Sequence, residues 1–337
     1  MLKINNRRYI GNKAKLIDRI EQAIDSTISL ENYSVADIFA GTGIVAYTYA
    51  TKGHPVIVND TLYSNVVVYR AILSSDYYDE KKLISLIEQI NHTPYQDIEE
   101  NYFSRIYGNK YYSINDAKKI GYIREFIEAQ KDNLTNREYF ILLASLLYAA
   151  DKIANTVGHF EYFLKKVPSD TNFQLELFEL QNLNDVRIFN EDANELSRKI
   201  EADVIYVDPP YNARQYINFY HVLENLARWN KPEIFEGNSM KFLRNELKSG
   251  YSTASAPKLF RDLIQHLNCK LIVVSYNNTY NASSSASNNR IQEKELISIL
   301  SMRGQVEKIE IDYKSFNAGK TDFKNHQEYL FVCKVGE

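Results

Sequence analysis

The sequence contains very little cysteine. Cys269 and Cys333 are the only two among 337 residues, and they lie far apart. The six histidines form no HxxH pattern and do not cluster with the cysteines. Because a disulfide framework needs paired cysteines and a zinc site needs closely spaced Cys or His ligands, the sequence predicts neither, and we expect no bound metal.

Long apolar runs are missing as well. No run reaches the roughly 20 residues that cross a membrane as a helix. The N-terminus, MLKINNRRYI, lacks the apolar core of a signal peptide. We therefore expect a cytoplasmic protein with no membrane partner.

A strong excess of one charge is also absent. The formal net charge of −3 excludes a globally basic nucleic-acid-binding protein. Basic residues nevertheless gather near both ends of the chain, where they form either local patches for a polyanion or solvated charged faces, and the pattern leaves both open. The residues concerned are Lys3, Arg7, Arg8, Lys13, Lys15 and Arg19 near the N-terminus and Lys314, Lys320 and Lys324 in the C-terminal region.

What is present is an alternation of strand and helix patterns in the first and last thirds. VADIFAGTG (35–43) predicts a strand entering a glycine turn, VAYTYATKG (45–53) a helix, and PVIVND (55–60) a second strand. This βαβ order predicts an α/β fold. Further strands are expected at 186–192, 203–210 and 270–278, a terminal antiparallel pair at 305–315 and 328–335, and a polar loop at 281–289.

The alternation stops after residue 60. The segment 61–185 is rich in tyrosine, asparagine and helical pattern, as in EYFILLASLLYAADKIANTVGHF (138–160). With 45% hydrophobic residues the chain is long enough for two domains. We predict one α/β domain formed by 1–60 and 186–337, and an inserted, mostly helical domain over 61–185.

The glycine turn is the first candidate site. Gly41 and Gly43 would let the backbone approach a ligand closely at the carboxyl end of the first strand. Asp37 lies on that strand and faces the crevice in which such sheets bind ligands. The turn lacks the third glycine of the dinucleotide fingerprint. Asp60 ends the next strand, where an acid accepts hydrogen bonds from ribose hydroxyls, although it could instead cap the following helix. The pattern favours a nucleoside-containing cofactor.

A second candidate is VIYVDPPY (204–211), a strand that ends in an acid, two prolines and a tyrosine. The Asp208 carboxylate and the Pro209 carbonyl only accept hydrogen bonds, so they suit the amino group of a planar base. Tyr211 offers a flat face for stacking. The alternative is a stiff turn leaving a sheet.

Five segments in this order resemble the adenine-specific DNA methyltransferases of the Dam type, with the alpha order of motifs: RRYIGNKAKL (7–16), DIFAGTG (37–43), VND (58–60), NEDA (190–193) and DPPY (208–211). Three more resemble the FokI-like branch of restriction-modification methyltransferases: YHVLENLARW (220–229), SYNNTYN (275–281) and YKSFNAGKTDFKNHQEYLFVC (313–333). The likeness spans nearly the whole chain. It implies a Rossmann-like methyltransferase sheet with a terminal antiparallel hairpin, and a target-recognition domain over 61–185.

The resemblance implies S-adenosylmethionine as the methyl donor. Asn12 departs from the pattern, because many relatives carry glycine there. The implied cofactor-binding residues are Tyr9, Gly11 and Lys13 in the N-terminal motif, Asp37, Phe39, Gly41 and Gly43 on the methionine side, Asp60 at the ribose and Asp192 near the adenine.

The implied reaction is direct methyl transfer to the exocyclic amino group of an adenine flipped out of duplex DNA. Asp208 and the Pro209 carbonyl would bind the amino group, and Tyr211 would stack on the base, its hydroxyl being secondary. No covalent enzyme intermediate is needed.

Duplex DNA is the implied partner, and a separately encoded cognate restriction endonuclease is a second expected one. ANTVGHF (154–160) could contact DNA or could be a helix end capped by Gly158. GKT (319–321) is not a nucleotide-binding loop, because Lys314 stands where that motif requires glycine, and a hairpin turn touching phosphate fits better. The predicted DNA-binding residues are Arg214, Gln215, Asn155, Thr156, His159 and Lys320.

Three other functions remain open: an RNA adenine methyltransferase, a protein-glutamine methyltransferase and a catalytically inactive DNA-binding relative. The large insertion favours duplex DNA over RNA. Asp208 disfavours the glutamine enzymes, which usually carry asparagine there. The intact set of Asp37, Asp60, Asp208 and Tyr211 disfavours an inactive protein.

Overall fold

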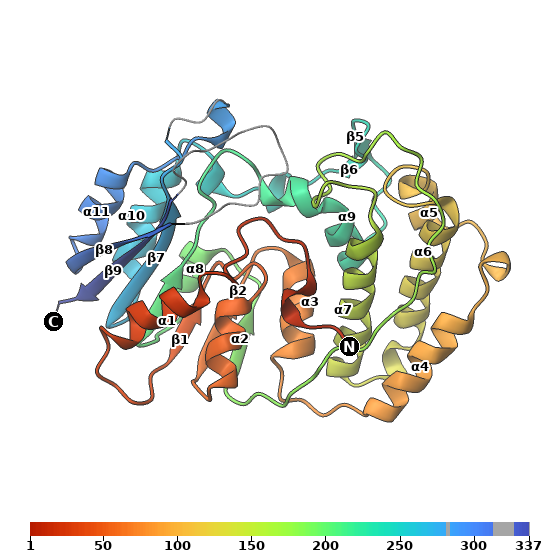
Figure 1. The fold of residues 1–337 in the computed structure, drawn as a ribbon, viewed down its shortest axis with the longest axis horizontal. Coiled ribbons are helices and arrows are strands. Elements are labelled where there is room, and N and C mark those ends of the chain that lie inside the picture. Colours follow the sequence, from red (N-terminus) through yellow and green to blue (C-terminus); the bar gives the residue numbers. More distant parts are fainter. Residues whose placement is uncertain (281–283, 313–326, 337) are drawn as a thin grey trace. The chain divides into compact units, whose positions relative to one another are not determined.

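The computed structural model describes residues 1–280, 284–312 and 327–336 (Figure 1). The chain forms two compact units, each described by itself below. The sheet unit comprises Asn12–Thr61, Asp185–Tyr216 and Glu246–Glu337, and the helical unit comprises Met1–Gly11, Leu62–Asn184 and Ile217–Asn245. Two segments that the sequence analysis assigns to the α/β domain, at the N-terminus and at 217–245, thus cluster with the helical segment.

The sheet unit is built on one seven-stranded sheet with the order β3-β2-β1-β4-β7-β9-β8. Strands β3, β2, β1, β4 and β7 run parallel, and β9 runs antiparallel to both β7 and β8. The predicted α/β fold and its terminal antiparallel pair are confirmed. The strands span Val35–Asp37 (β1), Val56–Asn59 (β2), Val186–Phe189 (β3), Val204–Val207 (β4), Leu271–Asn277 (β7), Gly304–Asp312 (β8) and Gln327–Val335 (β9).

Helices cover this sheet because its central strands are apolar on both faces. Strands β1, β2 and β4 are buried along their whole length, as expected of parallel strands packed on each side. One core joins the sheet to α8, α10 and α11 through side chains such as Leu196, Leu263 and Leu296. The helices of this unit span Ile17–Asp25 (α1), Ile44–Thr51 (α2), Ala193–Ser197 (α8), Ala256–His266 (α10) and Glu293–Leu300 (α11).

The strand order reverses between β1 and β4. The chain passes from β1 outward to β2 and β3, and then returns to β4 on the other side of β1. Ligands of such sheets bind in the crevice at the carboxyl ends of the strands where this reversal occurs. Asp37 is the last residue of β1, and Asp208 follows directly after β4. The topology therefore brings the two candidate carboxylates to one edge of the sheet.

The helical unit holds the long helices (Figure 1). Helices α3 and α7 pack closely, and the buried Glu224 of α9 accepts hydrogen bonds from the backbone N–H groups of Tyr63 and Ser64 at 2.9 Å each. This carboxylate satisfies donors that the first turn of α3 leaves open. The elements span Tyr63–Ile72 (α3), Glu80–His92 (α4), Tyr102–Tyr107 (α5), Ile114–Ala129 (α6), Asn136–Ile153 (α7), Tyr216–Arg228 (α9), Phe235–Glu236 (β5) and Lys241–Phe242 (β6).

Asn59, the last residue of β2, ties together the strand ends that carry the candidate site. Its side-chain amide donates to the carbonyls of Ile38 at 3.1 Å and Glu191 at 3.0 Å. Its side-chain oxygen accepts from the Glu191 N–H at 2.9 Å. Because Asn59 is 1% exposed, water cannot replace these bonds.

We expect Asn59→Ala to lower the free energy of unfolding by about 1–3 kcal/mol, because the substitution leaves buried backbone groups without partners. The measurement is the midpoint of urea unfolding, compared at an unchanged dependence of the unfolding free energy on urea concentration (the m value). Asn133→Ala is the control: the side-chain amide of this exposed asparagine donates to Gln130 Oε1 at 3.3 Å, so the change in its free energy of unfolding should stay within about 0.5 kcal/mol. Equal midpoints for the two variants would contradict the role given to Asn59.

Candidate functional site

Asp208 lies at the centre of a compact polar cluster in the sheet unit. The Tyr211 hydroxyl donates to Asp208 Oδ1 at 2.5 Å, and the Lys13 ammonium lies 3.2 Å from Asp208 Oδ2. Lys13 Nζ also donates to the Tyr211 hydroxyl oxygen at 2.9 Å. A second hydroxyl, that of Ser275 on β7, lies 3.1 Å from the same oxygen. Both carboxylate oxygens of Asp208 thus face donors.

The charge of Asp208 is balanced between opposing effects. Burial raises the pKa of Asp208 most, and the Lys13 ammonium and the Tyr211 hydrogen bond lower it. The nearby Glu328 carboxylate raises it again. Burial and the Asp208 charge together hold the pKa of Tyr211 well above its usual value, so this phenol is a neutral hydrogen-bond donor.

Pro209 is buried, and Tyr211 is held from two further sides. Its ring packs on the ring of Tyr276, with centroids 4.5 Å apart at 48°. Its carbonyl accepts from the Tyr276 hydroxyl at 3.1 Å and from the Arg290 N–H at 2.7 Å. The turn after β4 is therefore fixed by its own prolines and by contacts with β7.

The glycine turn after β1 needs glycine at both predicted positions. Gly41 has φ of 54° and Gly43 has φ of 77°, in the left-handed region that side chains disfavour. Gly43 is the N-cap of α2. The Gly41 N–H donates to Asp60 Oδ2 at 2.8 Å, which joins the ends of β1 and β2. Helix α3 has Leu62 as its N-cap, so the alternative in which Asp60 is the cap of this helix is wrong. The predicted ribose contact of Asp60 stays a prediction.

Asp37 is the most deeply buried acid of this edge. It is 1% exposed, and neither carboxylate oxygen makes a hydrogen bond of ordinary geometry to the described part of the chain. Burial raises its pKa well above the usual value, the charges of Asp208 and Asp60 add to this, and the N–H groups of Ala46 and Phe39 oppose it. A buried carboxylate in this state suits a cationic ligand group.

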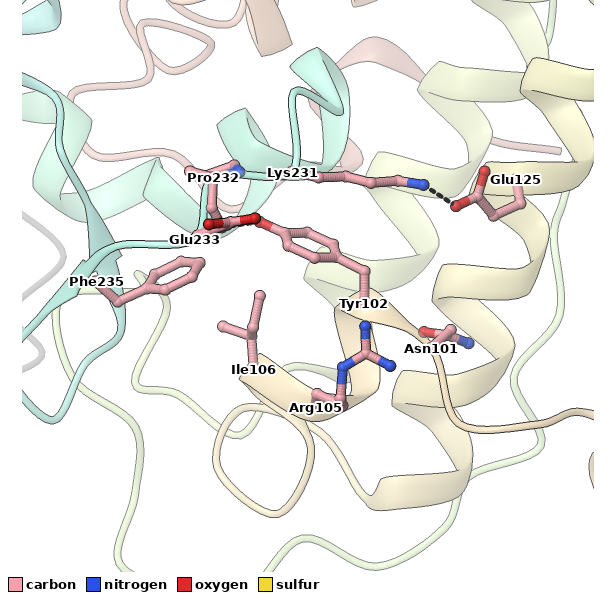
Figure 2. A pocket seen from close by; sticks show the side chains of 9 residues that line it. All are labelled: Asn101, Tyr102, Arg105, Ile106, Glu125, Lys231, Pro232, Glu233 and Phe235. Atoms are coloured by element: carbon pink, nitrogen blue, oxygen red, sulfur yellow. Dashed lines mark hydrogen bonds and ion pairs between the residues drawn. The ribbon is translucent and has the colours of Figure 1, made fainter.

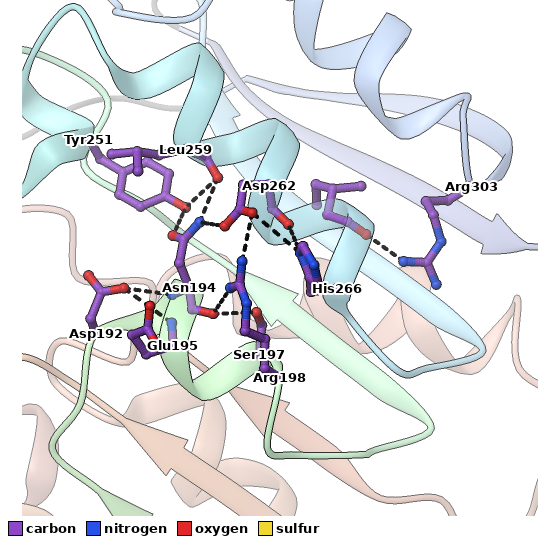
Figure 3. Close-up of polar contacts among 11 residues, drawn as sticks. Asp192, Asn194, Glu195, Ser197, Arg198, Tyr251, Leu259, Asp262, His266 and Arg303 are labelled. Carbon is purple, nitrogen blue, oxygen red and sulfur yellow. Dashed lines mark hydrogen bonds and ion pairs between the residues drawn. The ribbon is translucent and has the colours of Figure 1, made fainter.

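Phe39 and Asp192 are the remaining predicted cofactor residues of the sheet unit. The Phe39 ring meets Tyr251 edge-on at 5.2 Å, and the Tyr251 hydroxyl donates to Asn194 Oδ1 at 2.7 Å (Figure 3). Asp192 caps α8 by accepting from the N–H groups of Asn194 at 2.9 Å and Glu195 at 3.3 Å. The capping role explains an acid here without any ligand, so the predicted adenine contact stays a prediction.

The N-terminal motif up to Gly11 belongs to the helical unit. The Tyr9 ring stacks on Tyr220 with centroids 4.5 Å apart and planes 4° apart, and the Arg7 guanidinium lies 5.5 and 5.3 Å from these rings. Gly11 has φ of 80°, a conformation that favours glycine. Cofactor binding by Tyr9 and Gly11 stays a prediction.

The predicted DNA-binding residues have contacts of their own. The Asn155 amide donates to the carbonyls of Lys110, Leu164 and Lys166, so it holds the loop after α7. Thr156 is buried and its hydroxyl accepts from the Gly158 N–H, while the His159 ring packs on Phe219 at 4.9 Å. Helix α7 ends at Ile153 with Ala154 as its C-cap, so the alternative of a helix end capped by Gly158 is wrong.

Two further DNA candidates lie in the sheet unit. Arg214 is exposed and donates to the Ser287 hydroxyl at 3.1 Å. Gln215 is paired twice with the backbone of Ser249, at 3.0 and 2.7 Å. Lys320 and the turn 319–321 lie outside the described residues. None of these predictions is decided by the geometry.

A pocket of about 620 Å³ opens in the helical unit (Figure 2). No residue predicted for the site lines it. Lys231 and Glu125 pair across one side, and the Tyr102 hydroxyl donates to the Pro232 carbonyl at 3.2 Å. The lining residues are Asn101, Tyr102, Arg105, Ile106, Glu125, Lys231, Pro232, Glu233 and Phe235.

The described residues contain no group of three or more His, Cys, Asp or Glu side chains placed to hold a metal ion. Both cysteines are unpaired thiols. In the same part of the chain, no helix has the length and apolar character needed to cross a membrane.

Sequence reasoning did not single out two residues of the Asp208 cluster, Ser275 and Glu328. It assigned Lys13 to the cofactor, and that assignment stays a prediction. Ser275 and Glu328 both lie in segments that carry the family resemblance, SYNNTYN and the C-terminal segment. The signal was present as motif membership, but a motif does not say which side chains meet.

Comparison with known proteins identifies similar sequences. Residues 9–296 match the family model described as D12 class N6 adenine-specific DNA methyltransferase. The modification methylase StsI of Streptococcus sanguinis is 36% identical over 97% of this chain, and the modification methylase LlaI of Lactococcus lactis subsp. lactis is 35% identical over 80%. The type II methyltransferase M.NlaIII of Neisseria lactamica is 31% identical over 97% of this chain.

These relatives differ in length. The match covers 98% of M.NlaIII, but 51% of StsI and 46% of LlaI. The chain therefore spans about half the length of the latter two proteins.

The raised pKa of Asp37 gives a pH-dependent prediction for stability. A carboxyl group whose pKa is raised by folding lowers stability increasingly as the pH rises above the unfolded value, about 3.9. Asp37→Asn should therefore raise the melting temperature at pH 7, and the gain should disappear as the pH falls toward about 4.

Asp203→Asn is the matched control with the opposite sign. Burial opposes ionisation of Asp203, but the bonds from Lys270 and Ser34 outweigh it and lower its pKa. Its ionised form stabilises the fold, so this substitution should lower the melting temperature at pH 7 and matter less in acid. A melting temperature of Asp37→Asn below the parent at pH 7 would show that Asp37 makes stabilising contacts instead.

Proposed function

The chain belongs to the D12 class N6 adenine-specific DNA methyltransferases, and on this premise we propose that it transfers a methyl group from S-adenosylmethionine to the exocyclic amino group of adenine in duplex DNA. The observation that carries the proposal is the meeting of Asp37 and Asp208 at one edge of the sheet, beside a glycine turn. Asp37, the proposed cofactor-binding carboxylate, would then lie beside Asp208, the proposed base-binding acid.

The residues after β1 and β2 fit the cofactor. S-adenosylmethionine carries a sulfonium and an ammonium group, and the buried Asp37 carboxylate, which lacks an ordinary hydrogen bond to the described residues, suits a cation. Gly41 and Gly43 leave room for close approach of the backbone. When bound, the cofactor would supply an electrophilic methyl group. Tyr9, Gly11, Phe39, Asp60 and Asp192 are its other proposed contacts, as the resemblance implies.

Asp208 is the proposed acceptor for the adenine amino group. The lone pair of this amino group is delocalised into the ring, so it is a poor nucleophile. Hydrogen bonds from its N–H groups to the Asp208 carboxylate and the Pro209 carbonyl would localise the lone pair and stabilise the positive charge that develops on nitrogen. The stiff turn after β4 supports this role, because it holds both acceptors in place.

Lys13 fits the base-binding side better than the cofactor side. Its ammonium lies 3.2 Å from Asp208 and 2.9 Å from the Tyr211 hydroxyl. The Tyr211 hydroxyl donates to Asp208, which argues that the hydroxyl matters as well as the ring. We therefore revise the expectation that this hydroxyl is secondary.

Duplex DNA is the proposed substrate, and the segment 61–185 is the proposed target-recognition domain. The target base must leave the helix to reach Asp208. Arg214, which is exposed beside the DPPY turn, and Gln215 are proposed contacts of the DNA near the flipped base, and Asn155, Thr156, His159 and Lys320 are proposed contacts elsewhere. Methylation assays on matched duplex DNA and on RNA separate this proposal from an RNA methyltransferase.

A role in restriction-modification is the proposed biological context. The relatives named above are modification methylases and a type II methyltransferase. We infer that this chain protects a specific DNA sequence from a cognate endonuclease encoded separately. Sequencing of methylated bases in DNA from cells expressing the protein tests the activity and gives the recognised sequence, and cleavage by a candidate endonuclease before and after methylation tests the pairing.

Asp208→Ala should abolish methyl transfer while cofactor and DNA binding are largely kept, because it removes an acceptor aimed at the transition state. The measurements are single-turnover methylation of duplex DNA and calorimetry with S-adenosylmethionine. Asp60→Ala should instead weaken cofactor binding, since Asp60 holds the glycine turn. An Asp208→Ala rate within about tenfold of the parent, a loss near 1.4 kcal/mol, would overturn the assignment.

Tyr211→Phe and Tyr211→Ala separate the hydroxyl from the ring. Tyr211→Phe removes the hydrogen bond from the hydroxyl to Asp208, which lowers the pKa of Asp208. Because Asp208 must be ionised to accept the amino group, the methylation rate should fall. The acid limb of its pH–rate profile should move to higher pH. Ala loses in addition a stacking free energy of about 1–3 kcal/mol per base.

Mismatched DNA is the control that distinguishes the two effects. Flipping an adenine opposite a mismatch costs less free energy. Mismatched DNA should therefore restore more of the methylation rate of Tyr211→Ala than of Tyr211→Phe. A Phe variant at the parental rate would show that the hydroxyl is secondary. A folded Ala variant at the parental rate would exclude stacking.

A further inference from the structure

Lys13 lies between two carboxylates. Its ammonium is 3.2 Å from Asp208 Oδ2 and 3.9 Å from Glu328 Oε2. All three side chains are sheltered, with exposed fractions of 7% for Lys13, 16% for Asp208 and 8% for Glu328. One ammonium against two carboxylates leaves this group of three with a net negative charge.

Glu328 is held by the sheet. It is the second residue of β9 and pairs with Asn277 of β7, and Leu330 pairs with Ser275 in the same register. Side chains of paired residues, and of residues two apart on a strand, point to the same face. Glu328 therefore faces the same side as Ser275, whose hydroxyl lies 3.1 Å from that of Tyr211.

A cation so near the acceptor opposes the proposed reaction. In the proposed transfer the adenine nitrogen would become positively charged as its bond to the methyl carbon forms and the bond from that carbon to the sulfonium sulfur breaks, its electron pair staying on sulfur. The nitrogen would lose a proton to water only afterwards. Lys13 alone would cancel the Asp208 charge that stabilises this nitrogen and would repel it. At a pH where Asp208 is ionised, the second carboxylate compensates for the ammonium. Near the pKa of Asp208 it acts in the opposite sense, because it raises that pKa.

We propose that Glu328 is a positioning residue of the methyl transfer: its carboxylate, 3.9 Å from the Lys13 ammonium, compensates for that charge, so that the group of Lys13, Asp208 and Glu328 keeps a net negative charge toward the target amino group. This inference rests on the proposed function, and it adds a residue from the last strand that acts through Lys13.

The decisive variant is Glu328→Gln, which keeps the shape and removes the charge. At a pH where Asp208 is fully ionised, its single-turnover rate on duplex DNA should fall about 10- to 100-fold, the loss seen when a partner that orients a metal ligand is removed. The dissociation constants for S-adenosylmethionine and DNA should change little, because Glu328 acts in the transfer step. Glu328→Asp, which keeps the charge, should retain more activity than Glu328→Asn, and this pair repeats the test should the Gln variant fail to fold.

A double variant tests the route through Lys13. Lys13→Met together with Glu328→Gln removes one charge of each sign and restores the net negative charge. The double variant should therefore be faster than the product of the two single losses predicts. Losses that simply multiply would overturn the proposal, and so would a Glu328→Gln rate equal to the parent's. Glu307→Gln, on the exposed face of the neighbouring β8, is the matched control and should keep the parental rate.

A readout without activity separates this proposal from the proposed function. In the protein without DNA, the side-chain 15N resonance of Lys13, assigned by its loss in Lys13→Arg, should shift in Glu328→Gln and not in Glu307→Gln. An unshifted resonance would contradict the contact. A parent that methylates no DNA would contradict the proposed function, whereas an active parent with an equally active Glu328→Gln variant would contradict only the role of Glu328.

Discussion

The burial of two acids at the carboxyl ends of neighbouring strands is the constraint on which the rest of the sheet unit depends. Asp37 ends β1 and Asp208 follows β4, and burial raises the pKa of both. Such groups are costly in a folded protein unless a partner or a ligand compensates for the charge. The surroundings of Asp208 supply the partners, Lys13 and Tyr211. Those of Asp37 leave its oxygens without an ordinary hydrogen bond to the described residues, which is the state expected of a site made for a ligand.

The turn after β4 shows why prolines follow the acid. Prolines fix their own backbone and donate no hydrogen bond, so the turn gains rigidity but must find other anchors. The Tyr211 carbonyl provides one by accepting from Tyr276 and Arg290, and its hydroxyl provides another by donating to Asp208. The same tyrosine therefore anchors the turn and tunes the acid, and a purely stacking role does not account for its contacts.

Much of the fold could be predicted from sequence because its signals are local. The apolar runs of β1, β2 and β4, the glycine turn and the strand-ending acids each lie within a few residues, and their order gave the α/β sheet with its terminal antiparallel pair. The grouping of Ile217–Asn245 with the helical unit could not be predicted, since it depends on contacts between distant segments such as that of Glu224 with Tyr63. The meeting of Lys13, Asp208 and Glu328 is of the same kind, because it joins the start, the middle and the end of the chain. Local structure also explained residues chosen for function: Asn155 holds its own loop and Asp192 caps α8.

Electrostatics links the two halves of the proposed site. The Asp208 charge raises the pKa of Asp37, and such an interaction is reciprocal. A cationic ligand at Asp37 would therefore ease the ionisation of Asp208. Lys13 and Glu328 enter the same balance, since one lowers the pKa of Asp208 and the other raises it. The net charge at this edge of the sheet is thus shared by residues of β1, β9, the turn after β4 and the N-terminal segment. This explains why a residue as distant in sequence as Glu328 can affect Asp208, the proposed base-binding acid.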